Sequence, residues 1–258
     1  MITANLIDVM GDDLSPVRSA KVSFDNDNDV QPEGWQFIDL PCVSRDQPIL
    51  TPQQKRLIEY LARGMTQGEF VDLCQDARQE PAKALWKFRR TPTHAAPFGH
   101  AFMSFRIEAP VFVARQLVKH EYLRMSEVSR RYVKSDPVYW CPDTWHGIAD
   151  NVKQGSGEPL SQEGQWDATG NFDFAVEYAD KLYKWMLEYV SAEEARIVLP
   201  LCHMTRWYWS GSLDAFANMC NLRLDNHAQG ATRDVASMIS KQAKQAFPVS
   251  WDALVGDR

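Results

Sequence analysis

The sequence lacks the patterns that mark membrane-spanning, exported and zinc-binding proteins. Its longest apolar runs, such as IVLPL at 197–201, are too short to cross a bilayer. Met1 is followed by neither the basic segment nor the apolar segment of an export signal. The five cysteines form no Cys-x-x-Cys pair, and no His-Glu-x-x-His pattern joins the histidines. We therefore expect a cytoplasmic protein with reduced thiols, no membrane association and no metal site.

Basic residues are not in excess either. With 28 Lys and Arg against 34 Asp and Glu, the formal net charge is −6. Binding to duplex nucleic acid draws on many Lys and Arg contacts to phosphates, so we expect no nucleic-acid partner. A single nucleotide is compatible with this charge, since a few well-placed arginines hold one phosphate. The phosphate loops Gly-x-x-x-x-Gly-Lys and Gly-x-Gly-x-x-Gly are missing, as is the Gly-x-Ser-x-Gly turn of hydrolases.

What the chain does have is the composition of an ordinary globular protein. Of its 258 residues, 45% are hydrophobic and 24% are charged, and this length suffices for one large domain. Helical and extended periodicities both occur along it. We expect an α+β fold with several helices around a small central sheet, in a single domain 1–258 with apparent insertions near 65–90 and 147–171.

Helices are predicted where apolar residues recur at a period near that of the α-helix. The segments 52–64, 67–88 and 174–190 show this pattern. In 174–190 the stripe predicted to be buried consists of Phe174, Tyr178, Leu182, Trp185, Met186 and Tyr189. A terminal helix is predicted from the stripe Val235, Ile239, Ala243 and Phe247. The polar, glycine-rich segment 147–171 is expected to be a loop.

Extended structure is predicted in two places. Residues 1–40 alternate short apolar stretches with acidic turns, as loops and short strands do. In 102–108 every second residue is apolar, which predicts a half-buried strand. Pro110 is then expected to open a helix at its favoured first position. One face of that helix is predicted to carry Phe112, Gln116, Lys119 and His120.

Charged residues crowd the segment 110–132 and a second region around Arg223. Alone, the first segment is typical of a solvated helix whose charges pair at i, i+4. In the second region arginines lie among apolar residues, where each needs a carboxylate or a ligand phosphate as partner. That group comprises Arg196, Arg206, Arg223, Asp225, Asn226, His227 and Gln229. Cys202 and Cys220 are conceivable nucleophiles, but nothing nearby indicates activation, and buried structural thiols are expected.

One long segment resembles a known family signature. Residues 102–132 read FMSFRIEAPVFVARQLVKHEYLRMSEVSRRY, which is similar to the RHRxxSxNExSxRY motif of the flavin-dependent thymidylate synthases and the FxFxIxAPxFVARQ that precedes it. The motif's tail is present as Glu127, Ser129, Arg131 and Tyr132. Other similar blocks follow in family order: LIDVMGDDLSPVRSAKVSF, HAAPFGH, ARIVLPL, TRWYW and NLRLDNHAQ.

The resemblance implies a homotetrameric enzyme with active sites between subunits. Each site would hold FAD, dUMP and methylenetetrahydrofolate, with NADPH as reductant and no cysteine nucleophile. The residues that the resemblance assigns to dUMP are Gln116, Lys119, Glu127, Ser129, Arg130, Arg131, Arg196 and Arg223, with Arg223 as the catalytic residue. Those assigned to FAD and folate are Ser23, His94, Lys119, His120, Glu127 and Asn218.

The residues that contact flavin in the family differ more than those that contact the nucleotide. The family's RHR reads Lys119-His120-Glu121, its His-x-Thr-Pro-Phe has Ala96 for Thr, and its Asn-x-Arg ends in Asp214. An acid in place of an arginine weakens binding of a diphosphate. Three hypotheses follow: reductive methylation of dUMP to dTMP, hydroxymethylation of dUMP without net reduction, and non-catalytic nucleotide binding. A cytosine nucleotide is a further conceivable substrate.

Overall fold

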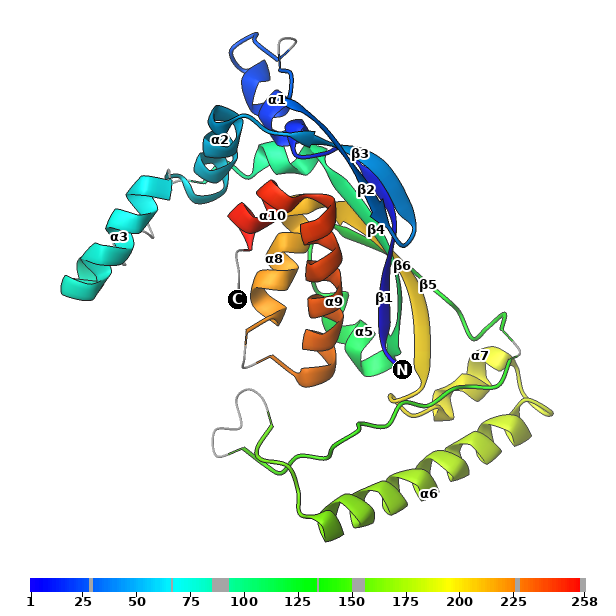
Figure 1. Ribbon diagram of the computed structural model, residues 1–258. Coiled ribbons are helices and arrows are strands. Elements are labelled where there is room, and N and C mark those ends of the chain that lie inside the picture. Colours follow the sequence, from blue (N-terminus) through cyan, green and yellow to red (C-terminus); the bar gives the residue numbers. More distant parts are fainter. Residues whose placement is uncertain are drawn as a thin grey trace. The chain divides into compact units, whose positions relative to one another are not determined.

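The computed structural model describes residues 1–27, 30–65, 67–84, 93–133, 135–149, 156–225 and 228–255, and it has the expected α+β class (Figure 1). The chain forms two compact units. Unit 1 comprises Met1–Ala4, Arg106–Trp209 and Leu222–Met238. Unit 2 comprises Asn5–Phe105, Ser210–Asn221 and Ile239–Arg258. The expectation of a single domain stays a prediction.

A four-stranded sheet contains segments from distant parts of the chain. Its order is β1 (Thr3–Met10), β4 (Phe102–Pro110), β6 (Met204–Ser212) and β5 (Leu123–Glu127). The predicted strand is confirmed in β4, where Met103, Phe105 and Ile107 are buried. The apolar face of this strand therefore contributes to the core, as the alternation requires.

The helix after β4 is shorter than expected. Pro110 ends the strand and is the N-cap of α5 (Val111–Leu117), so its predicted place inside the helix was wrong by one residue. Because α5 ends at Leu117, Lys119 and His120 lie in the turn after it and not on a shared helix face. The main-chain N–H of His120 donates to the Leu117 carbonyl at 3.1 Å, and Tyr122 takes a positive φ of 63° before β5 begins.

Unit 2 holds a group of helices and a hairpin. These elements are α1 (Leu14–Val22), the hairpin β2 (Gly34–Leu40) and β3 (Val43–Ile49), α2 (Pro52–Arg63), α3 (Gln67–Gln79), the 3-10 helix η1 (Ala96–His100), most of α8 (Leu213–Arg223) and α10 (Pro248–Leu254). The prediction of only loops and strands over 1–40 missed α1. The buried Asp13 carboxylate accepts the N–H groups of Val249 and Ser250 in the first turn of α10.

Two helix predictions in unit 2 are confirmed. Helix α2 begins with a reciprocal capping box between Thr51 and Gln54, and Gly64 ends it with a φ of 68°. Helix α3 covers the first part of the segment expected to be helical. Residues 85–88 of that segment lie outside the described residues. Met65, Leu73 and Ala84 form a small apolar cluster of their own beside α3.

The longest helix of unit 1 begins earlier than predicted. Helix α6 spans Gln162–Met186, so the expected loop over 147–171 was wrong for its last ten residues. Ser161 caps the helix, because its side chain accepts the N–H of Gly164 at 3.2 Å. Gly164 and Gly170 are poor helix formers. Because they interrupt the helical pattern, periodicity did not predict this first part of the helix.

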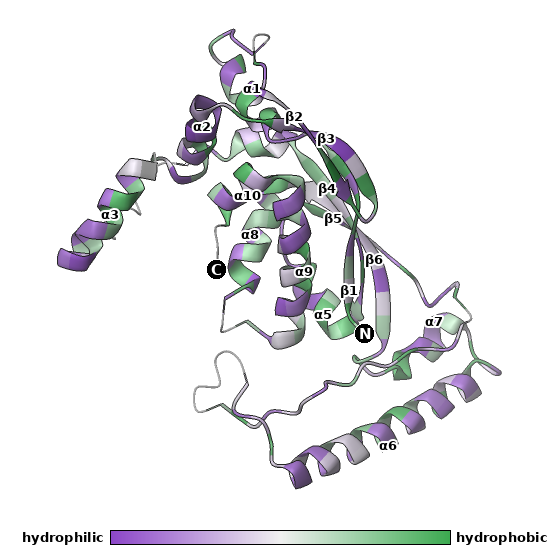
Figure 2. Cartoon of the chain, in the orientation of Figure 1, coloured by the Kyte–Doolittle hydropathy of each residue, from purple (hydrophilic) through white to green (hydrophobic). Residues whose placement is uncertain are grey.

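The predicted buried face of α6 is mostly exposed. Phe174, Tyr178, Trp185 and Tyr189 are each more than half exposed. The helix instead buries Tyr183, with Met186 beside it, against Ala195 of α7 (Ala192–Ala195) and Leu199. Figure 2 shows hydrophobic and hydrophilic residues mixed along the whole of α6. The prediction identified the apolar residues of this face, but it was wrong that the rest of the same chain buries them.

The last long helix agrees with its predicted stripe. Helix α9 (Gly230–Ala246) contains Val235, Ile239 and Ala243, and Phe247 follows it; all four are fully buried. Between α7 and β6 lies the 3-10 helix η2 (Arg196–Val198). Within the described ranges, no helix is long and apolar enough to span a membrane.

Candidate active site

Arg223, the last residue of α8, lies at the centre of the first group of expected site residues. Its Nε donates to Nε2 of His120 at 3.0 Å, and its Nη2 donates to the main-chain carbonyl of Gln116 at 3.4 Å. Burial, followed by the charge of Arg223, lowers the pKa of His120 from 6.5 to about 4. The imidazole is therefore neutral at physiological pH and accepts the hydrogen bond.

The positive charge of Arg223 has no carboxylate partner in this group. Among the described residues, both hydrogen-bond acceptors of its guanidinium are uncharged: the His120 ring and the Gln116 carbonyl. A half-buried guanidinium held by neutral acceptors can still stabilise an anion. The neighbouring Asn226 and His227, named in the sequence pattern, lie outside the described residues.

The side chain of Gln116 is held by two residues that the sequence did not single out for this purpose. Thr232 Oγ1 donates to Gln116 Oε1 at 2.8 Å, and Gln116 Nε2 donates to Oε1 of Gln229. Thr232 is 0% exposed and lies in the first turn of α9. Nothing in the one-dimensional pattern marks this threonine, because it lies 116 positions from its partner.

A second group gathers around Glu193. Its carboxylate pairs with Arg131, Nε to Oε2 at 3.1 Å, and its main-chain carbonyl accepts from Nε of Arg196 at 3.2 Å. Ser129 Oγ accepts the main-chain N–H of Arg131 at 3.3 Å. Ser191 caps α7, the helix that carries Glu193, because its Oγ accepts the main-chain N–H of Glu194 at 3.3 Å. The structure thus brings Ser129, Arg131 and Arg196 together.

Glu127 ends strand β5 and is fixed from β6. Thr205 Oγ1, which is buried, donates to Glu127 Oε1 at 2.6 Å, and the main-chain N–H of Val128 donates to the carbonyl of Arg206 at 2.9 Å. Thr205 was not predicted as a site residue, although it belongs to the TRWYW block. Lys119, also expected here, is exposed.

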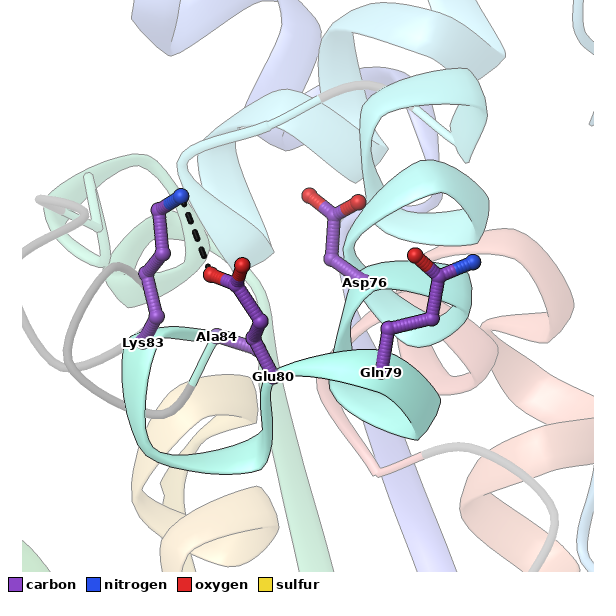
Figure 3. Close-up of a pocket in the computed structure, with 5 residues that line it drawn as sticks. All are labelled: Asp76, Gln79, Glu80, Lys83 and Ala84. Atoms are coloured by element: carbon purple, nitrogen blue, oxygen red, sulfur yellow. Dashed lines mark ion pairs between the residues drawn. The ribbon is translucent and has the colours of Figure 1, made fainter.

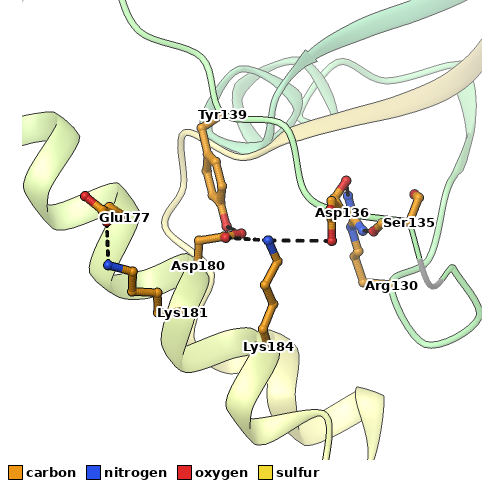
Figure 4. Close-up of polar contacts among 8 residues, drawn as sticks. All are labelled: Arg130, Ser135, Asp136, Tyr139, Glu177, Asp180, Lys181 and Lys184. Atoms are coloured by element: carbon orange, nitrogen blue, oxygen red, sulfur yellow. Dashed lines mark hydrogen bonds and ion pairs between the residues drawn. The ribbon is translucent and has the colours of Figure 1, made fainter.

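Arg130 has a different set of contacts from Arg131. Its guanidinium donates to the main-chain carbonyls of Ser135 and Asp136, as Figure 4 shows. Beside it, Lys184 of α6 pairs with Asp180 at 2.8 Å and Asp136 at 3.7 Å. These contacts hold the segment after β5 close to α6. The expected role of Arg130 in nucleotide binding stays a prediction.

Two of the residues expected to bind flavin line one cavity in unit 2. Ser23 and His94 both face a cavity of about 890 Å³. Tyr60 stacks on the His94 ring with centroids 5.9 Å apart and an interplanar angle of 23°. Apolar groups dominate the remaining lining, which includes Phe24, Leu57, Leu61, Ala95, Ala96 and Pro97. Asn218 is an exposed residue on α8.

A smaller polar cavity has a chemistry that suits neither a nucleotide nor a flavin. Near α3, a cavity of about 200 Å³ is lined by Asp76, Gln79, Glu80, Lys83 and Ala84 (Figure 3). Its one lysine already pairs with Glu80 at 3.0 Å. In the part of the chain that the structure describes, no cluster of three or more His, Cys, Asp or Glu could hold a metal ion.

The thiols of Cys141, Cys202 and Cys220 lie in surroundings that disfavour their ionisation. Burial raises the pKa of the fully buried Cys220 thiol, and it also raises the pKa values of Cys202 and Cys141. A raised pKa disfavours the thiolate, the nucleophilic form. The expectation that neither Cys202 nor Cys220 is an activated nucleophile therefore agrees with the structure.

Comparison with known proteins identifies the family. A flavin-dependent thymidylate synthase of Thermosipho africanus is 29% identical over 252 residues, covering 97% of this chain and 89% of that protein. One of Ehrlichia ruminantium is 33% identical over 178 residues, covering 67% of this chain and 59% of that protein. A solved structure of PolB from Streptomyces cacaoi, a UMP/dUMP methylase bound with 5-Br dUMP, has the same fold, with a TM-score of 0.73 at 23% identity over 98% of this chain and 94% of PolB. The model of the thymidylate synthase complementing protein (Thy1) family matches residues 49–249, and the chain belongs to that family.

Proposed function

We propose that this chain is a cytoplasmic enzyme that transfers a one-carbon unit from methylenetetrahydrofolate to C5 of dUMP, giving dTMP with FAD and NADPH. The observation that supports this most is the state of Arg223: a half-buried cation held by two uncharged acceptors. It occupies the position that the resemblance assigns to the catalytic arginine. Curated relatives named flavin-dependent thymidylate synthases support the same reaction.

Arg223 has an electrostatic role in this proposal. C5 of the uracil becomes nucleophilic as negative charge builds on the ring, before it attacks the one-carbon unit, and a preorganised guanidinium lowers the energy of that charged state. His120 and the Gln116 carbonyl hold the guanidinium without neutralising it. The carboxamide of Gln116 supplies a further hydrogen bond that fixes the orientation of the ring.

The phosphate of dUMP is held by the second group. Arg131 and Arg196 supply charge-assisted hydrogen bonds, and Ser129 supplies a hydroxyl. The pair between Arg131 and Glu193 is about half exposed on both sides. Such pairs contribute little stability, so a phosphate dianion can replace the Glu193 carboxylate as the partner of Arg131.

The 890 Å³ cavity fits the ring of FAD better than its diphosphate. The stacked pair of Tyr60 and His94 offers a flat aromatic surface, and Ser23 offers a hydroxyl at the edge. Lys21 is the one cation among the lining residues that the structure describes. Asp214, where the family has arginine, has a buried Oδ1 with no hydrogen-bond partner among the described residues. The chemistry that bound, reduced FAD supplies is hydride donation.

Among the described residues no hydrogen bond or ion pair joins the group around Arg223 to the group around Glu193, which is consistent with sites built between copies. We propose a homotetramer in which one subunit supplies the group around Arg223 and another supplies the group around Arg131 and Glu193. Each group alone offers only part of a nucleotide site, either ring contacts or phosphate contacts.

The test of the proposed function is release of tritium from dUMP labelled at C5. We expect release that depends on methylenetetrahydrofolate and is lost in Arg223→Ala. Absence of release under every combination of folate, FAD and NADPH would contradict the proposal. Hydroxymethylation also releases C5 tritium, and the acids at Glu121 and Asp214 favour it as the second candidate, since both weaken contacts to a diphosphate.

A further inference from the structure

The carboxamide of Gln116 is held with one defined orientation. Its Oε1 accepts from Thr232 Oγ1 at 2.8 Å, and its Nε2 donates to Gln229 Oε1. An amide nitrogen has two hydrogens, so one N–H remains for a ligand, while Thr232 takes one of the two lone pairs of the oxygen. The Gln116 side chain is only partly buried and can meet a ligand.

Thr232 is placed to enforce this orientation. It is 0% exposed, and its hydroxyl reaches Gln116 from the first turn of α9. A buried hydroxyl that loses its partner is costly. The main chain of the same Gln116 accepts from Arg223 at 3.4 Å, so the carboxamide that Thr232 orients belongs to the residue that also contacts the catalytic arginine.

We propose, resting on the proposed function, that Thr232 is a positioning residue that makes the site select uracil over cytosine. It holds the Gln116 carboxamide with N–H toward the pyrimidine, at ring position 4. Uracil presents a carbonyl acceptor there, and cytosine presents an amino group that is itself a donor. A fixed N–H donor therefore forms a hydrogen bond with uracil and opposes the N–H of cytosine.

Removal of the Thr232 hydroxyl allows the carboxamide to turn over. The carboxamide of Gln229 can turn with it, since it offers either its oxygen or its nitrogen to Gln116, and the Gln116 oxygen then accepts from the cytosine amino group. In Thr232→Val, which keeps the shape of the side chain, we expect dUMP to bind about three- to tenfold more weakly. We expect dCMP to bind as well as or better than it does to wild type. Thr232→Ser keeps the hydroxyl and restores the preference for dUMP.

The experiment is calorimetric titration of the full-length protein with dUMP, dCMP and 2-deoxyribose 5-phosphate. The sugar phosphate has no base, so we expect its affinity to be unchanged in Thr232→Val. Ser240→Ala is the matched control: Ser240 lies on the same helix and accepts from Trp251 Nε1 at 3.0 Å. We expect Ser240→Ala to lower thermal stability and to leave all three affinities unchanged. If Thr232→Val does not fold, Thr232→Ala takes its place.

The outcomes are distinct. Loss of the dUMP preference in Thr232→Val, with sugar phosphate binding intact and rescue by serine, supports the inference. An unchanged ratio of dUMP to dCMP affinity in the folded variant overturns it and leaves the proposed function in place. Failure of the wild type to bind either nucleotide overturns the proposed function together with the inference.

Discussion

Arg223 donates its Nε hydrogen to Nε2 of His120 over 3.0 Å. This contact requires a lone pair on Nε2, so the imidazole is neutral and has its proton on Nδ1. A family resemblance alone assigns His120 to flavin. The geometry adds a second role for this histidine, which is to hold the catalytic guanidinium without neutralising its charge.

The pKa of His120 is therefore a direct check of this contact. Burial and the Arg223 charge lower that pKa from 6.5 to about 4. The unfolded chain binds the proton more tightly, so the contribution of His120 to stability is fully present above pH 6.5 and declines as the pH falls toward 4. We expect a histidine signal assigned by His120→Gln to titrate near pH 4 in NMR spectra. A titration near pH 6.5 in the folded protein would contradict the contact.

Two replacements of Arg223 distinguish the effect of its positive charge from the effect of its hydrogen-bond geometry. Arg223→Ala should lower kcat about 100- to 1000-fold, since a preorganised stabiliser of the developing charge is lost. Arg223→Lys keeps the charge but loses the Nε bond to His120, and it should recover only part of that activity. Kinetics with a parallel thermal melt check this. Normal turnover in folded Arg223→Ala would contradict the catalytic role proposed for Arg223.

Arg131 should behave differently from Arg223. Since its proposed partner is the phosphate in both ground and transition states, Arg131→Ala should raise the KM for dUMP roughly 10- to 100-fold with little change in kcat. Steady-state kinetics over a range of dUMP concentrations measure both parameters. A fall in kcat at unchanged KM would contradict the proposed role of Arg131 in binding the phosphate.

Glu193 competes with the phosphate for Arg131 in the ligand-free chain. Glu193→Gln removes the ion pair at 3.1 Å while keeping the shape of the side chain. We expect the dissociation constant for dUMP to fall about two- to fivefold, the range for a partly exposed ion pair. Titration calorimetry at low and high salt checks this. Weaker binding in this variant would mean that Glu193 orders Arg131 and does not compete with the ligand.

Mixing Arg131→Ala with Arg223→Ala tests whether subunits share sites, provided that the dUMP concentration is well below the KM of Arg131→Ala, where both variants have low activity. Arg131→Ala and Arg223→Ala each remove one of the two groups. If each group comes from a different copy, subunit exchange between these variants restores some wild-type sites and part of the activity. Variants that each remove the same group, such as Arg131→Ala with Arg196→Ala, are the control. No recovery after demonstrated exchange would place both groups of a site in one chain.

Local signals predicted much of the fold. The alternation in 102–108 and the helical spacing of apolar residues in 52–64 act over a few residues, so β4 and α2 could be predicted from the sequence. The start of α6 was missed because Gly164 and Gly170 interrupt its helical pattern. The apolar stripe of α6 was recognised, but periodicity says which residues share a face and not what covers them.

The candidate site shows the same limit. Arg131, Arg196 and Arg223 could be identified because their motifs are local, whereas Glu193 and Thr232 could not. The partners of these two are 62 and 116 positions away, and only the folded chain brings them together. An ion pair or hydrogen bond between residues so far apart in the chain produces no periodic pattern in the sequence.

Mass spectrometry of the nucleotide product tests the central claim most directly. The purified protein is incubated with dUMP, methylenetetrahydrofolate, FAD and NADPH, and each component is omitted in turn. We expect the mass of dTMP, formed only when all four are present. Formation of 5-hydroxymethyl-dUMP without NADPH would contradict reductive methylation, and recovery of unchanged dUMP in every mixture would contradict one-carbon transfer altogether.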